Sequence, residues 1–86
     1  MAKPVITIDL KGPNAETNNL IGVAHAAIME EGFRALKECR NYQMDGELIV
    51  QNYTTLATLM KNGAYHAQSY EGMVEAIEKY VTINWR

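Results

Sequence analysis

Two short β-forming segments near opposite ends of the chain, residues 5–10 and 81–85, constrain this fold more than any other feature. Both segments alternate in side-chain character, which is typical of a strand with one buried face. The apolar faces would comprise Ile6, Ile8 and Leu10 in the first segment and Val81, Ile83 and Trp85 in the second. A lone strand leaves its backbone hydrogen-bonding groups unpaired, so we expect the two segments to pair with each other.

Helical patterns fill much of the chain between these segments. A helix is predicted from Ala15 to Glu31, because apolar residues recur there at intervals of three and four. Asn14 is expected to be its N-cap, and Gly32 its left-handed C′ residue. Residues 33–40 could form a further short helix or continue this one beyond Gly32. A last helix should follow Ser69, which is a good N-cap. Its core face would comprise Met73, Val74 and Ile77, and its solvated face Glu71, Glu75 and Glu78.

The middle of the chain allows two interpretations. Asp45-Gly46 between apolar β-formers is typical of the type I′ turn of a β-hairpin, which a helix starting near Thr54 would follow. Alternatively, Asp45 caps a helix that runs through Met60. The stripe of that helix would comprise Ile49, Asn52 or Tyr53, Leu56, Leu59 and Met60, with Asn52 as a polar interruption. Strand propensity in residues 48–53 slightly favours the hairpin. Asn62-Gly63 is expected to end the helix in both cases.

These elements together predict an α+β fold. We expect a single domain spanning residues 1–86, since a chain of this length forms one hydrophobic core. The N- and C-terminal strands would form a short sheet, and two to four helices would pack on one face of it in a small two-layer structure. The hydrophobic fraction of 48% is sufficient for such a core.

The charge balance and the absence of long apolar runs narrow the range of partners. A net charge of −2 provides no general attraction to phosphate backbones, so nucleic acid is an unlikely partner. No apolar run is long enough for a membrane span or a signal peptide, so no membrane contact is expected. The single cysteine, Cys39, excludes an intramolecular disulfide. We therefore expect a cytoplasmic protein.

Two segments carry a resemblance to a known group. The first is Ile6-Thr7-Ile8-Asp9-Leu10-Lys11-Gly12-Pro13-Asn14, and the second is Ser69-Tyr70-Glu71 followed by residues 76–81. In both, the chain resembles a family of small uncharacterised proteins common in phages and other mobile elements. The chain departs from the family pattern at Ala15, where glycine is frequent. The resemblance implies an origin and a core of the fold, and it carries over no activity and no functional residue.

Residues that could support catalysis do not form a recognisable set. His25, His66 and Cys39 lie far apart in the sequence and lack the paired spacing of metal ligands. We therefore expect no enzyme activity, no metal and no cofactor. An alternative is a small-ligand or nucleotide-binding protein, in which the helix that begins after Gly12-Pro13-Asn14 receives an anion, with Asp9 and Asn14 nearby.

Large aromatic side chains are numerous for a chain of this size. Five tyrosines and one tryptophan are present, and those that remain at the surface would suit a protein interface. Trp85, Tyr65 and Tyr42 are the candidate interface residues, and Trp85 either closes the core or contacts a partner subunit. The sequence thus favours an accessory protein that acts by protein–protein interaction, with a homodimer as the expected assembly.

Overall fold

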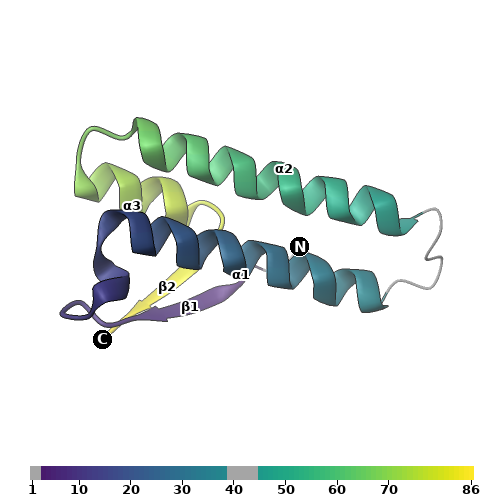
Figure 1. The fold of residues 1–86 in the computed structure, drawn as a ribbon, viewed down its shortest axis with the longest axis horizontal. Coiled ribbons are helices and arrows are strands. Elements are labelled where there is room, and N and C mark those ends of the chain that lie inside the picture. The colour runs from purple at the N-terminus through teal and green to yellow at the C-terminus, as the bar shows by residue number, and fades with distance from the viewer. Residues whose placement is uncertain (1–2, 39–44) are drawn as a thin grey trace.

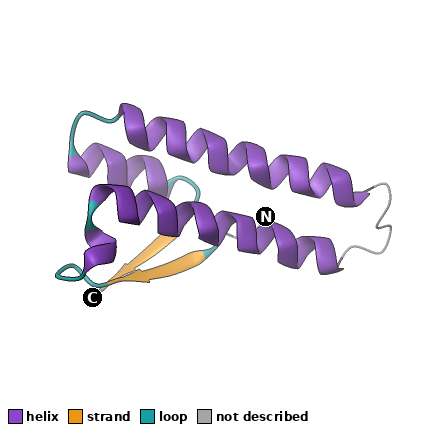
Figure 2. Cartoon of the chain, in the orientation of Figure 1, coloured by secondary structure: helices purple, strands orange, loops and turns teal. Residues whose placement is uncertain are grey.

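The computed structural model of the chain describes residues 3–38 and 45–86. In chain order they form β1 (Val5–Ile8), a short 3₁₀ helix η1 (Pro13–Ala15), α1 (Thr17–Glu38), α2 (Asp45–His66), α3 (Tyr70–Glu78) and β2 (Thr82–Trp85). The two strands lie side by side along one side of the helices (Figures 1 and 2). The predicted α+β fold, with a sheet made from the two ends of the chain, is confirmed.

β1 and β2 pair in parallel, with Val5 opposite Thr82 and Ile8 opposite Trp85. The hydrogen bonds continue past the strands, since the Arg86 N–H donates to the Ile8 carbonyl at 2.8 Å. Ile6 and Ile8 are buried, as their alternation predicted. The prediction for Leu10 is wrong: β1 ends at Ile8 and Leu10 is 61% exposed. The chain turns after Asp9, whose carbonyl accepts the Gly12 N–H at 2.9 Å, and this turn removes Leu10 from the sheet.

α1 differs from its prediction at both ends. Asn14 is not its N-cap, because residues 13–15 form η1 and the α-helix begins at Thr17. Gly32 is not a C′ residue, because α1 continues through it to Glu38, and no glycine in the described part of the chain has a positive φ. A Cβ on Gly32 would lie 2.8 Å from the Cβ of Tyr53 on α2. Gly32 is therefore explained by close packing between the two helices.

The hairpin predicted at Asp45-Gly46 is wrong, and the alternative helix is correct but longer than expected. α2 runs from Asp45 to His66 and passes through Asn62-Gly63 without ending. Its buried face consists of Tyr53, Ala57, Met60 and Ala64. Burial of this helical face outweighs the strand propensity of residues 48–53, since most helix stability in proteins comes from tertiary packing.

α3 follows the sequence prediction closely. The Ser69 hydroxyl accepts the Gly72 N–H at 3.0 Å, which is the expected N-cap. Met73 and Ile77 are buried, whereas the predicted solvated residues Glu71, Glu75 and Glu78 are exposed. This local agreement arises because the cap and the stripe lie within a few residues of each other.

α1 and α2 form a long antiparallel hairpin that only partly overlaps the rest of the structure. Each has 22 residues, or about 33 Å of helix, while α3 has nine residues, or about 14 Å. α3 and the strands lie toward one end of the hairpin, and its other end projects beyond them (Figure 1). The described residues extend over 42 × 25 × 17 Å. None of the described elements covers the helix surface at this projecting end.

Candidate binding surfaces

The turn between β1 and η1 contains the two residues proposed for an anion site. The Asp9 carboxylate accepts the Lys11 N–H at 3.0 Å, so its side chain stabilises the turn. A Cβ on Gly12 would lie 3.2 Å from the Cβ of Asp9, which explains a glycine there. Asn14 lies within η1 and is exposed. Both residues thus lie on one short segment, and their positions are accounted for by its structure.

A shallow cavity of about 240 Å³ lies where α2 meets α3. Thr17, Tyr65, Tyr70 and Met73 are among the residues that line it. The Tyr70 hydroxyl donates to the Ala15 carbonyl at 2.6 Å and joins α3 to η1. Tyr65, one of the predicted interface residues, is 58% exposed at this end of the molecule. The lining offers hydroxyl groups and apolar surface but no charged side chain.

The other predicted interface residues have different positions. Trp85 is half-buried and packs against the core, on the same face of the sheet as Ile8. Trp85 was expected either to close the core or to contact a partner subunit, and its packing fits the first of these roles. Tyr42 lies outside the described residues. The two described members of the set, Tyr65 and Trp85, lie on different elements, α2 and β2.

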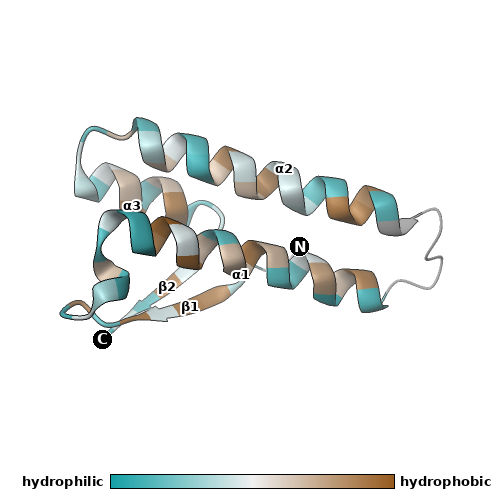
Figure 3. Cartoon of the chain, viewed as in Figure 1, coloured by the Kyte–Doolittle hydropathy of each residue, from teal (hydrophilic) through white to brown (hydrophobic). Residues whose placement is uncertain are grey.

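A row of apolar side chains along α2 forms another candidate surface. Three of its residues belong to the stripe of the helix that was the alternative to the β-hairpin. Leu48 and Leu59 are 56% and 50% exposed, and Ile49 and Leu56 between them are half-buried. Asn52, the polar interruption of this stripe, is exposed. In Figure 3, brown apolar segments alternate with polar ones along the part of α2 that lies beyond α3. We call Leu48, Ile49, Asn52, Leu56 and Leu59 the α2 stripe.

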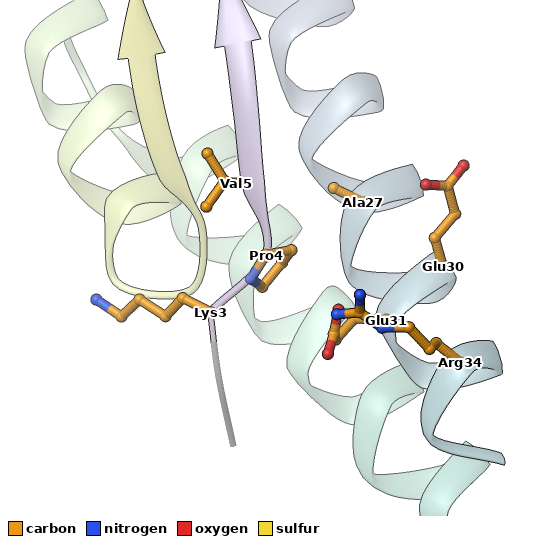
Figure 4. Close-up of a pocket in the computed structure, with 7 residues that line it drawn as sticks. All are labelled: Lys3, Pro4, Val5, Ala27, Glu30, Glu31 and Arg34. Atoms are coloured by element: carbon orange, nitrogen blue, oxygen red, sulfur yellow. The ribbon is translucent and has the colours of Figure 1, made fainter. Parts of the chain in front are cut away.

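A groove of about 390 Å³ lies between the start of β1 and the second half of α1, and sequence analysis missed it. Lys3, Val5, Ala27, Glu31 and Arg34 are among its lining residues (Figure 4). We call it the β1–α1 groove. Its residues come from segments more than twenty positions apart, and no spacing in the sequence signals that they meet.

An ion pair lies at one end of the β1–α1 groove. The Arg34 guanidinium donates to the Glu31 carboxylate within one turn of α1. The Glu31 side chain is 15% exposed and that of Arg34 is 65% exposed, so the guanidinium is the more accessible partner. Burial raises the pKa of the nearby Tyr53 hydroxyl above its usual value near 10. The negative charge of Glu31 raises this pKa further, and the positive charge of Arg34 lowers it. The end of the groove is therefore polar, with its exposed charge on arginine.

The two histidines lie on different helices, His25 in α1 and His66 in α2. His66 Nδ1 lies 2.6 Å from the Asn62 carbonyl oxygen within α2. His25 Nδ1 is buried in α1 without a hydrogen-bond partner. Among residues 3–38 and 45–86, no three His, Cys, Asp or Glu side chains are close enough together to hold a metal ion. No helix in these same ranges has the length and apolar character that crossing a membrane requires.

Comparison of the chain with protein-family models, with curated proteins and with solved structures found no match. The surfaces above therefore have to be interpreted from their own geometry and chemistry.

Proposed function

We propose that this chain is a cytoplasmic accessory protein of a phage or other mobile element, and that it acts by non-covalent binding to proteins as a homodimer. The resemblance of its opening and closing segments to small phage and mobile-element proteins supports the origin. The α2 stripe supports the mode of action, because a row of half-exposed large apolar side chains on one helix is typical of a protein interface.

The α2 stripe continues a contact that already exists within the chain. Gly63 lies one further step along the same side of α2, and a Cβ there would lie 3.4 Å from the Cβ of Ala76 on α3. Ile49, Asn52, Leu56, Leu59 and Gly63 are spaced alternately by three and four residues, as in the seam of a coiled coil. α3 covers the last part of this seam, and its nine residues are too few to cover the first part. The first part is thus a helix-packing surface that no described element of the chain covers, and it is open to a partner.

A second copy of the chain fits this surface because the stripe is self-complementary. When two α2 helices cross antiparallel about a twofold axis near Thr54, Ile49 of each copy lies opposite Leu59 of the other. Asn52 then lies opposite Leu56, inside the seam. A polar residue at one seam position costs stability and helps to fix register and oligomeric state. The projecting ends of the two hairpins would together form a four-helix arrangement.

Size-exclusion chromatography with light scattering tests this dimer. Leu59→Ser removes apolar burial from both copies, about 2 kcal/mol in total, so we expect the dimer to weaken roughly thirtyfold. Asn52→Leu should strengthen the dimer, since it completes the apolar seam. Leu10→Ser is the matched control, because Leu10 is 61% exposed but lies in the turn after β1, away from the stripe.

The two leucine substitutions distinguish a dimer through the α2 stripe from a dimer through another face of the molecule. A wild-type protein that stays monomeric at millimolar concentration would contradict the proposal. A dimer that Leu10→Ser weakens as much as Leu59→Ser would place the interface elsewhere. Circular dichroism of each variant confirms that the monomer is folded before its assembly is compared.

A further inference from the structure

The outer edge of β1 has backbone groups that the sheet does not use. The Pro4 and Ile8 carbonyls accept hydrogen bonds from β2 and the Arg86 N–H, and the Leu10 N–H donates to the Arg86 carbonyl. In a parallel pair, alternate residues of a strand bond to the neighbour, so the N–H and C=O groups of Val5 and Thr7 point away from β2. None of the hydrogen bonds found outside the ladder and the helices, within residues 3–38 and 45–86, involves Val5 or Thr7.

The β1–α1 groove lies beside this free edge. Figure 4 shows α1 on the side of β1 opposite to β2, with the Ala27 side chain toward the strand. Ala27 is small and half-buried, and it leaves open space between the strand and the helix. A third strand placed next to β1 would rest on this part of α1. The volume of about 390 Å³ is within the range of clefts that bind ligands.

We infer that the β1–α1 groove binds a single extended segment of a partner protein, which adds to β1 as a third strand and places a carboxylate on Arg34. The observations that carry this are the free edge of Val5 and Thr7, the adjoining groove, and the exposed guanidinium at its end. Main-chain hydrogen bonds would supply affinity in this mode, and side-chain pockets would supply specificity. The site is separate from the α2 stripe, so the inference does not depend on the dimer.

The charges around the groove select an acidic segment. Glu31 is largely buried and is already paired with Arg34. Glu30 points away from the strand in Figure 4, and Lys3 Nζ donates to the Glu78 carbonyl at 3.1 Å. Arg34 is 65% exposed, and a guanidinium has five N–H donors, more than the contact with Glu31 requires. A carboxylate is the group that a planar guanidinium binds best.

The shape of the groove selects an extended segment over a second copy of the chain. If β1 of a second copy paired with β1, that copy would bring its own α1 alongside its strand, on the same face. The two α1 helices would then compete for one space, because helices pack 8–10 Å apart whereas paired strands lie about 4.8 Å apart. A segment with no helix attached avoids this conflict. Relief of the open edge by a partner strand is also a known way to manage an exposed strand.

Selection from a surface-displayed library of random ten-residue peptides with free carboxyl termini tests the inference. The bait is the wild-type chain, and each isolated peptide is then measured against variants by fluorescence anisotropy. Thr7→Pro removes one outward N–H and leaves the ladder with β2 intact, since proline is tolerated on an edge strand. Thr7→Val is the matched control, because it keeps the N–H and the β-branched shape. Ala27→Trp fills the groove and is the second variant should Thr7→Pro fail to fold.

We expect the isolated peptides to bind wild type and Thr7→Val equally, and to bind Thr7→Pro and Ala27→Trp about tenfold more weakly. Amide hydrogen exchange at Val5 and Thr7 should slow when a peptide is bound. Peptides that bind Thr7→Pro and Ala27→Trp as tightly as wild type would overturn the site, and so would a selection that yields no peptide.

Arg34→Gln tests the carboxylate. We expect it to weaken carboxylate-bearing peptides about fivefold and to leave their uncharged amide analogues unchanged. The carboxylate that binds Arg34 could be the C-terminus of the peptide or a side chain. Peptides with an amidated C-terminus test the first source, and peptides with Asp→Asn or Glu→Gln changes test the second. Equal loss for charged and uncharged peptides would overturn the role of Arg34.

Discussion

Gly32 provides the sharpest test of how α1 and α2 pack. In Gly32→Ala, the new Cβ would lie 2.8 Å from Tyr53 Cβ and 2.9 Å from Tyr53 Cγ. Tyr53 Cβ cannot rotate away, because its position is fixed by the backbone of α2, so a change of the Tyr53 χ1 rotamer would leave the 2.8 Å contact in place. The two helices must therefore move apart, and the buried contacts around this point are lost along with the clash.

The size of the effect is a balance of two terms. Overpacking a core costs about 1–3 kcal/mol. Replacing glycine by alanine inside a helix gains about 1 kcal/mol. We expect a net loss of about 1 kcal/mol in the free energy of unfolding, which would lower the Tm by roughly 4–8 °C for a domain of this size.

Gly22 is a matched control in the same helix, since a Cβ on it would meet nothing within 4 Å. Gly22→Ala should gain helix propensity without a clash and raise stability by about 0.5–1 kcal/mol. Urea unfolding followed by circular dichroism measures both variants. If Gly32→Ala stabilises the protein as much as Gly22→Ala, the close approach of α1 and α2 at Tyr53 is refuted.

Three further changes probe other parts of the fold. Ser69→Ala removes the N-cap of α3 and should cost about 1 kcal/mol in urea unfolding, and an unchanged midpoint would show that the cap is dispensable. Ile8→Ala should lower the free energy of unfolding by about 2–5 kcal/mol, because Ile8 is buried. Val5→Ala should change it by less than about 0.5 kcal/mol in the same assay, because the Val5 side chain is 60% exposed. The raised pKa of Tyr53 favours folding below pH 10, and this contribution should fall as the pH rises through the folded-state pKa. Alkaline titration at 295 nm should therefore show a late-titrating tyrosine in the native protein that is absent from Tyr53→Phe, and loss of stability above pH 10 should be smaller in that variant.

Features decided by neighbouring residues were predictable from the sequence. Ser69 and the stripe that follows it specify α3 within about ten residues, and the alternation of Ile6 and Ile8 specifies the buried face of β1. Pairing of the two strands followed because each needed a partner for its backbone groups. The direction of the pairing was not predicted, since alternation alone is the same for parallel and antiparallel strands.

Features decided by distant contacts were not predictable. Gly32 and Gly63 look like helix ends, yet each lies inside a helix at a point where another helix comes close. Asp45-Gly46 has the composition of a turn, but the long buried face of α2 outweighs that preference. Among the candidate sites, the α2 stripe was predictable only in part, because the helical interpretation grouped Ile49, Leu56 and Leu59 with Met60, which is buried. The β1–α1 groove was not, because it exists only once the strand and the helix are placed side by side.

The parallel pairing of β1 with β2 has a consequence for the order of folding. Val5 and Thr82 are separated by 77 positions, and closing a flexible loop of that length costs roughly 4 kcal/mol in entropy. Helices that form first shorten this loop, because the α1–α2 hairpin brings distant parts of the chain together. During synthesis, β1 must wait until residues 82–85 have been made. We therefore expect the helical hairpin to form early and the sheet to form last. β1 is then the element that spends the longest time without its partner.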